Sequence, residues 1–242
     1  GSVTTDAGLL LSAATKVRFR PVGDYFGSPT ALEVYMVEDS TPPTFTSDTA
    51  SPITYDTTGD TAVDVVSDSG ISLTTSVNNA NDDPTFSSIL DLSIVEDNPG
   101  SDTTGTATTI DTLLSGYFSD VDANTFTGIA ISANATTATQ GSWEYSDDGT
   151  TWVPIGTSTL SASAALALEK SYFLRFNPTG DYNNQSAESA LTVHPIDNIY
   201  TSGFTVGSSG VTVDASSVSL DDGIGGTGVS FGVLIGSIND AP

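Results

Sequence analysis

The chain contains no cysteine among its 242 residues. A disulfide framework, a thiolate metal site and a cysteine nucleophile are therefore excluded. Basic residues are almost as scarce, because five Lys and Arg stand against thirty Asp and Glu, and the formal net charge is -25. Since contacts with phosphate need Lys and Arg, we expect no nucleic-acid partner.

Long apolar runs are also missing. No stretch approaches the roughly 18 to 20 apolar residues that cross a bilayer, and no basic segment precedes an apolar one at the start. We therefore expect no direct membrane insertion, and we interpret the chain as a soluble piece from the interior of a longer protein. So much negative charge repels itself in a compact protein, so bound divalent cations, or less specifically a salty medium, are expected to neutralise it.

What the chain has in abundance is Thr, Ser, Gly, Asp, Asn and Val, arranged in short alternating or β-branched runs bounded by turn residues. Such runs predict an all-β protein built as a sandwich. One exception is the stretch 109–118, where Leu113, Leu114 and Phe118 would line one face of a short helix capped by Thr or Asp.

A repeated phrase organises the chain. Arg18-Phe-Arg-Pro-Val-Gly-Asp-Tyr25 returns 157 residues later as Arg175-Phe-Asn-Pro-Thr-Gly-Asp-Tyr182. The run Asn81-Asp-Asp-Pro84 returns 158 residues later as Asn239-Asp-Ala-Pro242. The chain therefore holds about one and a half repeats, and residues 1–84 match only the later half of a complete repeat in residues 85–242.

Two modules in tandem follow from this repeat, the first module being the shorter. Half of a sandwich would leave an apolar sheet face and unpaired strand edges in water. We therefore expect residues 1–84 to form a small sandwich from about six strands of their own, before the complete module of residues 85–242.

The second module contains an ordered set of short phrases. They are Val95-Glu-Asp97, Phe118-Ser-Asp-Val-Asp-Ala-Asn124, Gly128-Ile-Ala-Ile131, Gln140-Gly-Ser-Trp-Glu-Tyr-Ser146, Asp148-Gly-Thr-Thr-Trp152, Leu174-Arg-Phe-Asn-Pro178 and the closing Asn239-Asp-Ala-Pro242. No single phrase is specific, but their order resembles the long cadherin-like repeats of giant bacterial surface proteins, including RTX adhesins.

The resemblance implies a tandem array of immunoglobulin-like β-sandwich modules, secreted to the bacterial cell surface, with Ca²⁺ at or near the joints. Such modules act mostly as spacers or scaffolds. In some of these adhesins a ligand-binding domain is inserted into a module that is thereby split. Residues 1–84 match only the later half of the pattern and therefore have no counterparts of Glu96-Asp97 and Asp120-Val-Asp122, so calcium at a joint before residue 1 is not implied.

The residues themselves suggest a site for a hard cation. Asp120, Asp122 and Asn124 occupy alternate positions, so their oxygens can converge on Ca²⁺, which takes six to eight oxygen ligands. An Asx-rich turn that caps its own backbone is the alternative. The pair Glu96 and Asp97 in the same module favours calcium.

We accordingly predict one calcium site that joins the modules, formed by Glu96, Asp120 and Asp122 with Asn81 or Asp82 from the joint. The full set of candidate metal ligands is Asn81, Asp82, Asp83, Glu96, Asp97, Asp120, Asp122 and Asn124. At two equivalent strand ends, Glu38-Asp39 and Asp197-Asn198, a further ion and ordinary Asp-rich turns both remain open.

Two features that suggest other functions have simpler interpretations. The run Ser146 to Trp152 is one residue short of the Asp-box of sialidase-like propellers, and a hairpin turn with Gly149 at positive φ explains it better. His194 is the only histidine, so any Ser-His-Asp triad would depend on it. We expect it to be a buried or edge residue, and we expect no enzymatic activity.

The sequence thus predicts a calcium-stabilised extender or scaffold segment of a bacterial adhesin, monomeric, with neighbouring modules of the same adhesin as its partners. The alternative is a module that binds a peptide or glycan itself, or the split scaffold that carries such a domain. The aromatic side chains distinguish the two. A single open groove lined by Trp143, Trp152, Tyr182 and Tyr200 would favour binding, and separate buried rings would favour the extender.

Overall fold

A computed structural model describes residues 4, 7–38, 44–47, 52–56, 65–67, 69–102, 105–156, 159–184, 186–216 and 222–239. The chain divides into two compact units, Gly1–Ala80 (unit 1) and Asn81–Pro242 (unit 2). Asn81 to Pro84 therefore group with the second unit. The protein is nearly all β, as the sequence predicted.

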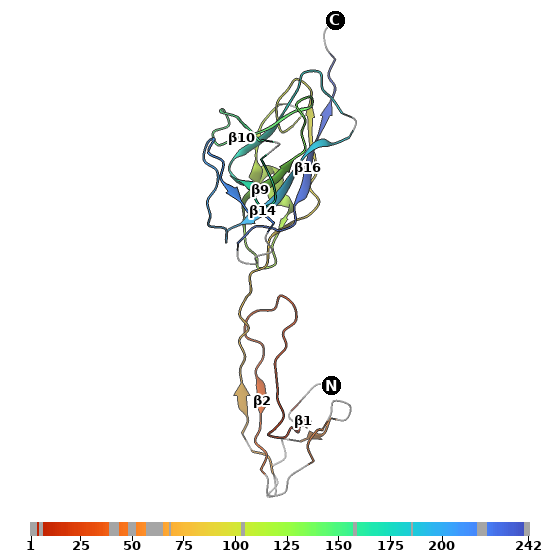
Figure 1. Cartoon of the computed structure of the whole chain (residues 1–242). Helices are drawn as coiled ribbons and strands as arrows, with labels where there is room; N and C mark the ends of the chain where they lie inside the picture. Colours follow the sequence, from red (N-terminus) through yellow and green to blue (C-terminus); the bar gives the residue numbers. More distant parts are fainter. Residues whose placement is uncertain are drawn as a thin grey trace. The chain divides into compact units, whose positions relative to one another are not determined.

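The larger sheet of unit 2 has six strands, and its centre is the antiparallel pair β9 and β14 (Figure 1). All neighbouring strands are antiparallel except β16 and β6, which run parallel. In spatial order the strands are β15 (Thr212–Val213), β12 (Ala165–Glu169), β9 (Phe126–Asn134), β14 (Glu188–Asp197), β16 (Val229–Gly236) and β6 (Leu92–Val95).

A second, four-stranded sheet packs against the first, which gives unit 2 a β-sandwich-like form. Trp143 is fully buried between the sheets, with its ring 5.4 Å from Phe176 and 5.5 Å from Phe231. Burial of these large rings and their aliphatic neighbours is the main stabilising contribution. The strand order is β11 (Val153–Pro154), β10 (Gly141–Ser146), β13 (Phe173–Pro178) and β7 (Thr108–Thr109).

The predicted short helix is present as α1 (Ile110–Leu114), followed by the 3₁₀ turn η1 (Ser115–Tyr117), but it is shorter than the stretch 109–118 and Phe118 lies in the next strand instead of on its apolar face. The Thr109 hydroxyl accepts a hydrogen bond from the Thr112 amide and caps the first turn. Ile110 and Leu114 are the fully buried residues of the helix, so it is anchored to the core. After it, β8 (Phe118–Ser119) pairs with β5 (Thr85–Phe86).

The hairpin prediction is confirmed. Strands β10 and β11 are antiparallel neighbours, and Gly149 has φ +72° in the turn between them. The Asp148 carboxylate accepts hydrogen bonds from the amides of Thr150 and Thr151, which lowers its pKa. Asp148 therefore stabilises the turn, as an Asx turn does.

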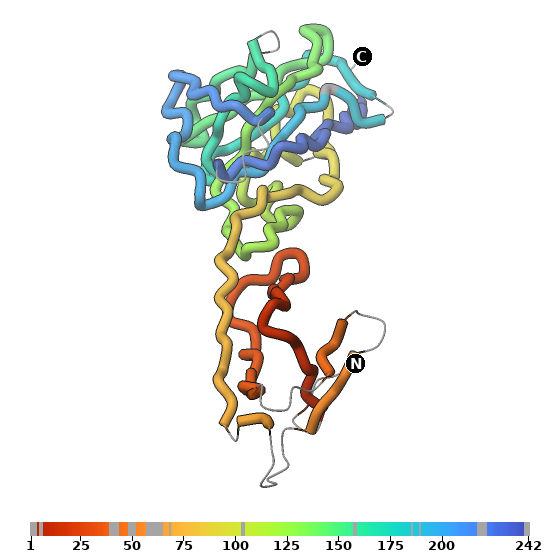
Figure 2. Tube along the Cα trace, turned by 60° about the horizontal axis from the view of Figure 1, so that its bottom comes forward, coloured from red at the N-terminus to blue at the C-terminus, as the bar shows by residue number. Residues whose placement is uncertain are grey.

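In its described residues, unit 1 is not built from two packed sheets like those of unit 2. Its strands form two separate ladders, β1 (Gly8–Leu9) with β3 (Thr54–Tyr55) and β2 (Leu32–Val34) with β4 (Ile71–Leu73). Figure 2 shows the extended segment before Asn81, in light orange, running beside the segment that holds β2. Leu32, Val34, Ile71 and Leu73 are all exposed, so the ladder of β2 and β4 does not bury an apolar face.

The small sandwich expected for residues 1–84 does not form in the described part of unit 1. Among the described residues of the unit, only Leu10 and Val66 are buried apolar side chains. Residues 61–66, an alternating run that is one of the six or so strands expected in this module, lie outside the described residues except for Val65 and Val66. The physical reason is a lack of facing layers, because two isolated two-stranded ladders are marginal in water and cannot cover one another's side chains.

The pairings within unit 1 nevertheless repeat those of unit 2. Leu32, Glu33 and Val34 pair with Leu73, Ser72 and Ile71, and the equivalent Leu191, Thr192 and Val193 pair with Phe231, Ser230 and Val229. Gly8 pairs with Tyr55 as Ala165 pairs with Val213, and the bridge of Val37 and Val66 matches that of Ile196 and Ile224. The numbering offset of these matches is 157 to 159 residues, and the small changes mark insertions in loops.

Replacing Ile131 in β9 with Ala tests how much unit 2 depends on its central strand. Ile131 is fully buried and pairs with Leu166 and Val193. We expect the free energy of unfolding to fall by about 2–5 kcal/mol, because apolar burial is lost and a cavity remains. Urea unfolding followed by tryptophan fluorescence measures this change, since both tryptophans lie in unit 2. Val206→Ala, at an exposed side chain, should change stability by less than about 0.5 kcal/mol.

Candidate metal centre

Four loops of unit 2 meet at one end of its sandwich, where they gather most of the predicted oxygen ligands. One precedes β5 and contains Asn81 to Pro84, and another connects β8 to β9 and contains Asp120 to Asn124. Asp197 ends β14 and pairs with Phe126 at the start of β9. The fourth loop precedes β16 and contains Asp222. We call this group the acidic end: Asn81, Asp82, Asp83, Asp120, Asp122, Asn124, Asp197, Asn198 and Asp222.

The Asp120 to Asn124 loop is a tight turn organised by its first carboxylate. Asp120 Oδ1 accepts hydrogen bonds from the amides of Asp122 at 2.8 Å and Asn124 at 3.2 Å. Ala123 has φ +61°, an uncommon conformation for a residue with a β-carbon. The Asx turn that the sequence offered as the alternative to a metal ligand is therefore present, and it uses one of the two Asp120 oxygens.

Side chains of this turn bind the segment before β5. Asp122 Oδ2 accepts a 2.6 Å hydrogen bond from the Asp82 amide. Asn124 Nδ2 donates to Asn81 Oδ1 at 2.8 Å and to Asp197 Oδ2 at 3.3 Å. The predicted ligands Asn81, Asp82, Asp122 and Asn124 are thus brought together.

Asp197 is the most deeply placed residue of the acidic end, with a relative exposure of 0%. Its Oδ1 accepts a hydrogen bond from the Ile199 amide at 2.8 Å, and its own amide donates to the Gly223 carbonyl. Burial raises the pKa of Asp197, the Ile199 amide opposes this shift, and the charge of Asp120 adds to it. The buried carboxylate therefore lies in an environment that disfavours its negative charge.

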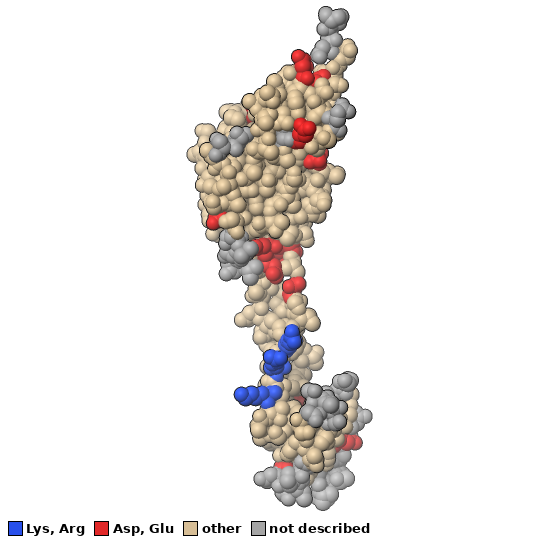
Figure 3. Space-filling view, turned by 45° about the vertical axis from the view of Figure 1, so that its right-hand side comes forward, with Lys and Arg blue, Asp and Glu red and all other residues tan. Residues whose placement is uncertain are grey.

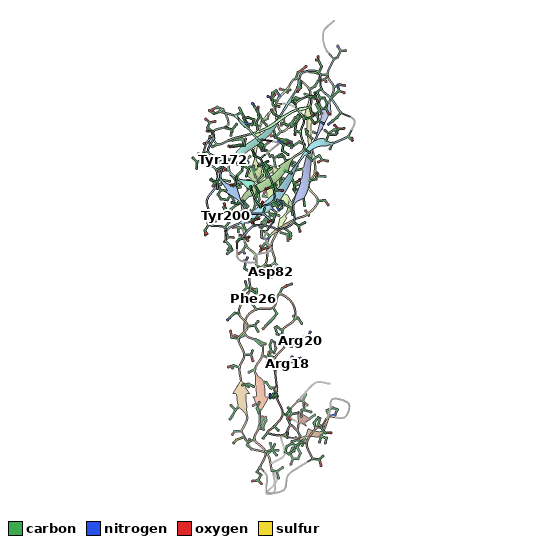
Figure 4. The ribbon with its side chains drawn as sticks, in the orientation of Figure 1. Arg18, Arg20, Phe26, Asp82, Tyr172 and Tyr200 are labelled. Carbon is green, nitrogen blue, oxygen red and sulfur yellow. The ribbon has the colours of Figure 1, made fainter. Side chains whose placement is uncertain are left out.

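The charge of the acidic end has no cationic side chain to balance it within unit 2. The only Lys and Arg between residues 81 and 242 are Lys170 and Arg175. Lys170 pairs with Asp111 at 3.8 Å and Arg175 with Glu144 at 2.7 Å. Figure 3 shows acidic side chains gathered at this end of unit 2 without Lys or Arg among them on the face shown, and Figure 4 labels Asp82 there.

The unbalanced negative charge of the acidic end acts on the carboxyl group of Asp83. Burial raises its pKa first, and the negative charges of Asp222, Asp197 and Asp82 raise it further. Two carboxylate oxygens of the acidic end, Asp83 Oδ1 and Asp120 Oδ2, are buried without a hydrogen-bond partner. Such atoms lose their hydration without compensation, which is costly for a charged group unless a cation or proton is supplied.

The donor chemistry fits a hard cation, because every side chain of the acidic end offers oxygen. The side chains of the acidic end are not yet arranged around one common point as the ligands of a bound ion would be. Within the described ranges, no three Asp, Glu or His side chains converge closely enough to form a ready set of metal ligands. Several oxygens are instead engaged with backbone amides, so coordination requires side-chain rotation.

Glu96 and Asp97 do not belong to this cluster, which corrects the prediction of a single site containing Glu96. Glu96 follows β6 and donates its amide to the Gly236 carbonyl, at the far end of β16. Its buried carboxylate accepts hydrogen bonds from Ile238 N and Asn183 Nδ2, while Asp97 Oδ1 accepts one from the Asp181 amide. The eight residues of β16 span about 25 Å, so the two groups are at opposite ends of the sandwich.

Asp197 and Asp222 were not among the ligands predicted for the joint. The sequence analysis had placed Asp197-Asn198 at a separate strand end, where a further ion or a turn remained open. The signal of Asp197 was its position at the end of a strand, but only the pairing of β14 with β9 brings that end to Asp120. Glu38 of the corresponding pair in unit 1 is exposed, and Asp39 and the terminal Asp240 lie outside the described residues.

His194 is a buried structural residue. Its Nδ1 donates to the Gly225 carbonyl at 2.7 Å, so Nε2 is left to accept the Ser132 hydroxyl at 2.9 Å. Burial lowers the pKa of His194 and the Gly225 contact opposes this shift. Both Ser132 and His194 are buried, and the group on Nδ1 is a backbone carbonyl where a triad has a carboxylate.

Comparisons with family models, curated proteins and solved structures found no match to this chain. Among the described residues, no helix has the length and apolar character needed to cross a membrane. The chemistry of the acidic end is therefore the main guide to function.

Replacing Asp83 with Asn should stabilise metal-free protein at neutral pH. The folded-state pKa of Asp83 is raised, so its contribution favours folding at low pH and is lost as pH rises through that pKa. We expect Asp83→Asn to melt at a higher temperature than the parent at pH 7 in chelator, and the difference to shrink toward pH 4. Thermal melts across this pH range measure it.

Asp147→Asn is the matched control, because it removes the same charge from an exposed position in the β10–β11 hairpin. An equal gain in both variants would mean that only net charge matters, and it would refute a local effect at Asp83.

Proposed function

We propose that the protein is a calcium-stabilised extender or scaffold segment of a bacterial cell-surface adhesin. One observation carries this proposal: the acidic end gathers carboxylates from four loops without a cationic side chain, and it holds two buried oxygens without partners, Asp83 Oδ1 and Asp120 Oδ2. A bound cation would remove both the repulsion and the unmet bonding.

Calcium is the ion that this donor set fits best. Carboxylate and amide oxygens are hard ligands, and Ca²⁺ accepts six to eight of them in flexible geometry. The residues that would hold the ion are Asp83, Asp120, Asp122 and Asp197, with Asn81 and Asn124 as neutral donors. The chain itself supplies the turn that presents Asp120 and the strand end that presents Asp197.

The ion would act mechanically. Asn81 to Asp83 lead directly into unit 2, and Asp122 and Asn124 already bind this segment through hydrogen bonds. Calcium would add strong links between the segment and the sandwich, and it would reduce the charge repulsion that pushes them apart. The path of the chain as it enters unit 2 would then be fixed, which is what an extender needs.

The remainder of the proposal rests on the sequence resemblance. Unit 2 corresponds to the complete cadherin-like, immunoglobulin-like module, and its sandwich-like pair of sheets is compatible with that family. We propose that the protein is secreted to the bacterial surface, that it is monomeric and non-enzymatic, and that its partners are neighbouring modules of the same adhesin. A peptide or glycan would be bound through an inserted or adjacent domain.

The aromatic residues favour an extender because they have separate partners, although Trp143 is the one buried ring of the four and Trp152, Tyr182 and Tyr200 are partly exposed. Trp143 lies in the core. Trp152 is under the Arg175 guanidinium at 3.8 Å, Tyr182 donates to Glu188, and Tyr200 packs on Phe204. Each ring thus has its own partners in a different part of unit 2, where a binding groove would gather them.

Calcium should raise the melting temperature of unit 2. Modules of extracellular proteins bind Ca²⁺ with dissociation constants of about 0.1–1 mM. At a concentration roughly a hundred times the dissociation constant, binding adds about 2.7 kcal/mol, or about 5–10 °C for a unit of this size. Tryptophan fluorescence melts in 10 mM Ca²⁺ and in chelator measure the shift.

The double variant Asp120→Asn/Asp122→Asn should lose most of this shift, while Asp147→Asn should keep it. Magnesium at equal ionic strength controls for screening of charge. A parent protein that melts at the same temperature with and without 10 mM Ca²⁺ would exclude the calcium site.

Calcium should also make the full chain longer and stiffer in solution. A fixed entry of Asn81 to Asp83 into unit 2 limits bending at that position, so the radius of gyration should rise and the distance distribution should narrow. Small-angle scattering in calcium and then in chelator tests this expectation. The Asp120→Asn/Asp122→Asn variant should scatter alike in both, and a parent that does the same would contradict the extender mechanism.

A further inference from the structure

The described residues of unit 1 form two of the strand pairings found in the later half of unit 2, and none of the pairings that involve its earlier half. Its ladders match β12 with β15 and β14 with β16, residue for residue in register. In unit 2, residues 85–157 contribute β5 to β11, including the central strand β9, the strands β7 and β10 on either side of β13, and β11 beside β10. Residues 1–84 align only with the part that follows them.

The missing strand has a defined position. In unit 2, β9 lies between β12 and β14 and pairs with both of them. Strands β1 and β2 of unit 1 are the equivalents of β12 and β14, and no described residue pairs with the edges of β1 and β2 that correspond to those held by β9. These open edges offer backbone groups for the addition of a strand.

The side chains that the strands of the earlier half help to bury in unit 2 have exposed counterparts in unit 1. Leu32 and Val34 of β2 are each 44% exposed, whereas the equivalent Leu191 and Val193 of β14 are each 0% exposed. Phe19 is 47% exposed, and its equivalent Phe176 is fully buried against Trp143 of β10. The same sequence positions are therefore core in one unit and surface in the other.

The exposed part of unit 1 around Phe19 also carries basic side chains. Arg175 pairs with Glu144 of β10, which belongs to the earlier half of the repeat. Its equivalent Arg18 is exposed, and it lies in one stretch with Lys16 and Arg20, as Figures 3 and 4 show. Three of the five basic residues of a strongly acidic chain thus line the segment that an acidic β10-like strand would join.

We infer that unit 1 is the acceptor half of a split sandwich, and that it binds a polypeptide with the sequence character of residues 85–157. A β9-like strand would enter between β1 and β2, and a β10-like strand would pair along residues 16–21 with its carboxylate on Arg18. Main-chain hydrogen bonds would supply affinity, and burial of Phe19, Leu32 and Val34 would supply stability.

To test this inference, a second copy of residues 85–157 is fused to the full chain ahead of Gly1. This is the position that the earlier half holds relative to the later half in the repeat. Amide hydrogen exchange is then compared in the original and extended chains. We expect the amides of Leu32 to Val34 and of residues 17–20 to exchange at least about a hundredfold more slowly in the extended chain, because a completed sandwich opens rarely.

A matched control carries Ile129→Asp and Ile131→Asp in the added copy alone, so that its β9 cannot be buried. The inference holds if the extended chain gains protection and this control does not. It fails if the extended chain gains none, or if the original monomer already protects these amides. Sedimentation adds one more outcome: protection that appears only as the original chain dimerises would make a second copy the occupant and would overturn the assignment.

Discussion

The antiparallel pairing of β9 with β14 is the constraint on which unit 2 depends. Its inward residues, among them Ile131 and Val193, form the centre of the core. At one end the same pairing brings Asp197 beside Phe126, and so beside the loop that carries Asp120 and Asn124. Stability and the acidic end therefore come from one set of backbone hydrogen bonds, and a shift in register would disturb both. Unit 1 shows the same β14-like sequence where no described strand takes the place of β9.

Negative charge is distributed unevenly with respect to burial. Most acidic residues of unit 2 lie in loops and turns, where water screens them, and Asp148 is engaged in an Asx turn. Asp197 and the buried oxygens of Asp83 and Asp120 are different, because the fold itself removes them from water. Buried charges of one sign are tolerated when protons or cations compensate them. The sequence supplies no Lys or Arg for that purpose at this end, which is why composition alone already suggested a cation.

Local features of this chain could be predicted from the sequence. The all-β class followed from short β-branched runs, the helix at Ile110 to Leu114 from its cap, and the hairpin at Gly149 from the Asp-Gly pair. These depend on residues close in sequence, whose preferences act directly on the backbone. The grouping of Asn81, Asp82, Asp122 and Asn124 was also accessible, because a joint and a strand-connecting loop were expected to meet.

Long-range pairings could not be predicted in this way. Glu96 was assigned to the joint because the pair Glu96 and Asp97 belongs to the same module as Asp120 and Asp122, but β6 runs parallel to β16 and carries Glu96 to the opposite end. The sandwich expected for residues 1–84 is not seen among the described residues of unit 1, for a related reason. Alternating residue patterns in a sequence indicate which segments form extended strands. They do not indicate whether a second sheet packs over side chains such as Phe19 and Leu32.

The position of Glu96 has a mechanical consequence. Unit 2 is entered through Asn81 to Pro84 at one end of the sandwich, and the chain leaves β16 at the other end, where Glu96 binds the Ile238 amide. Tension between these two points would act along β16, while its hydrogen bonds to β14 and β6 lie across that direction. The bonds would be loaded together in shear instead of opening one after another like a zipper, and β16 would leave the sheet only when many of them break at once.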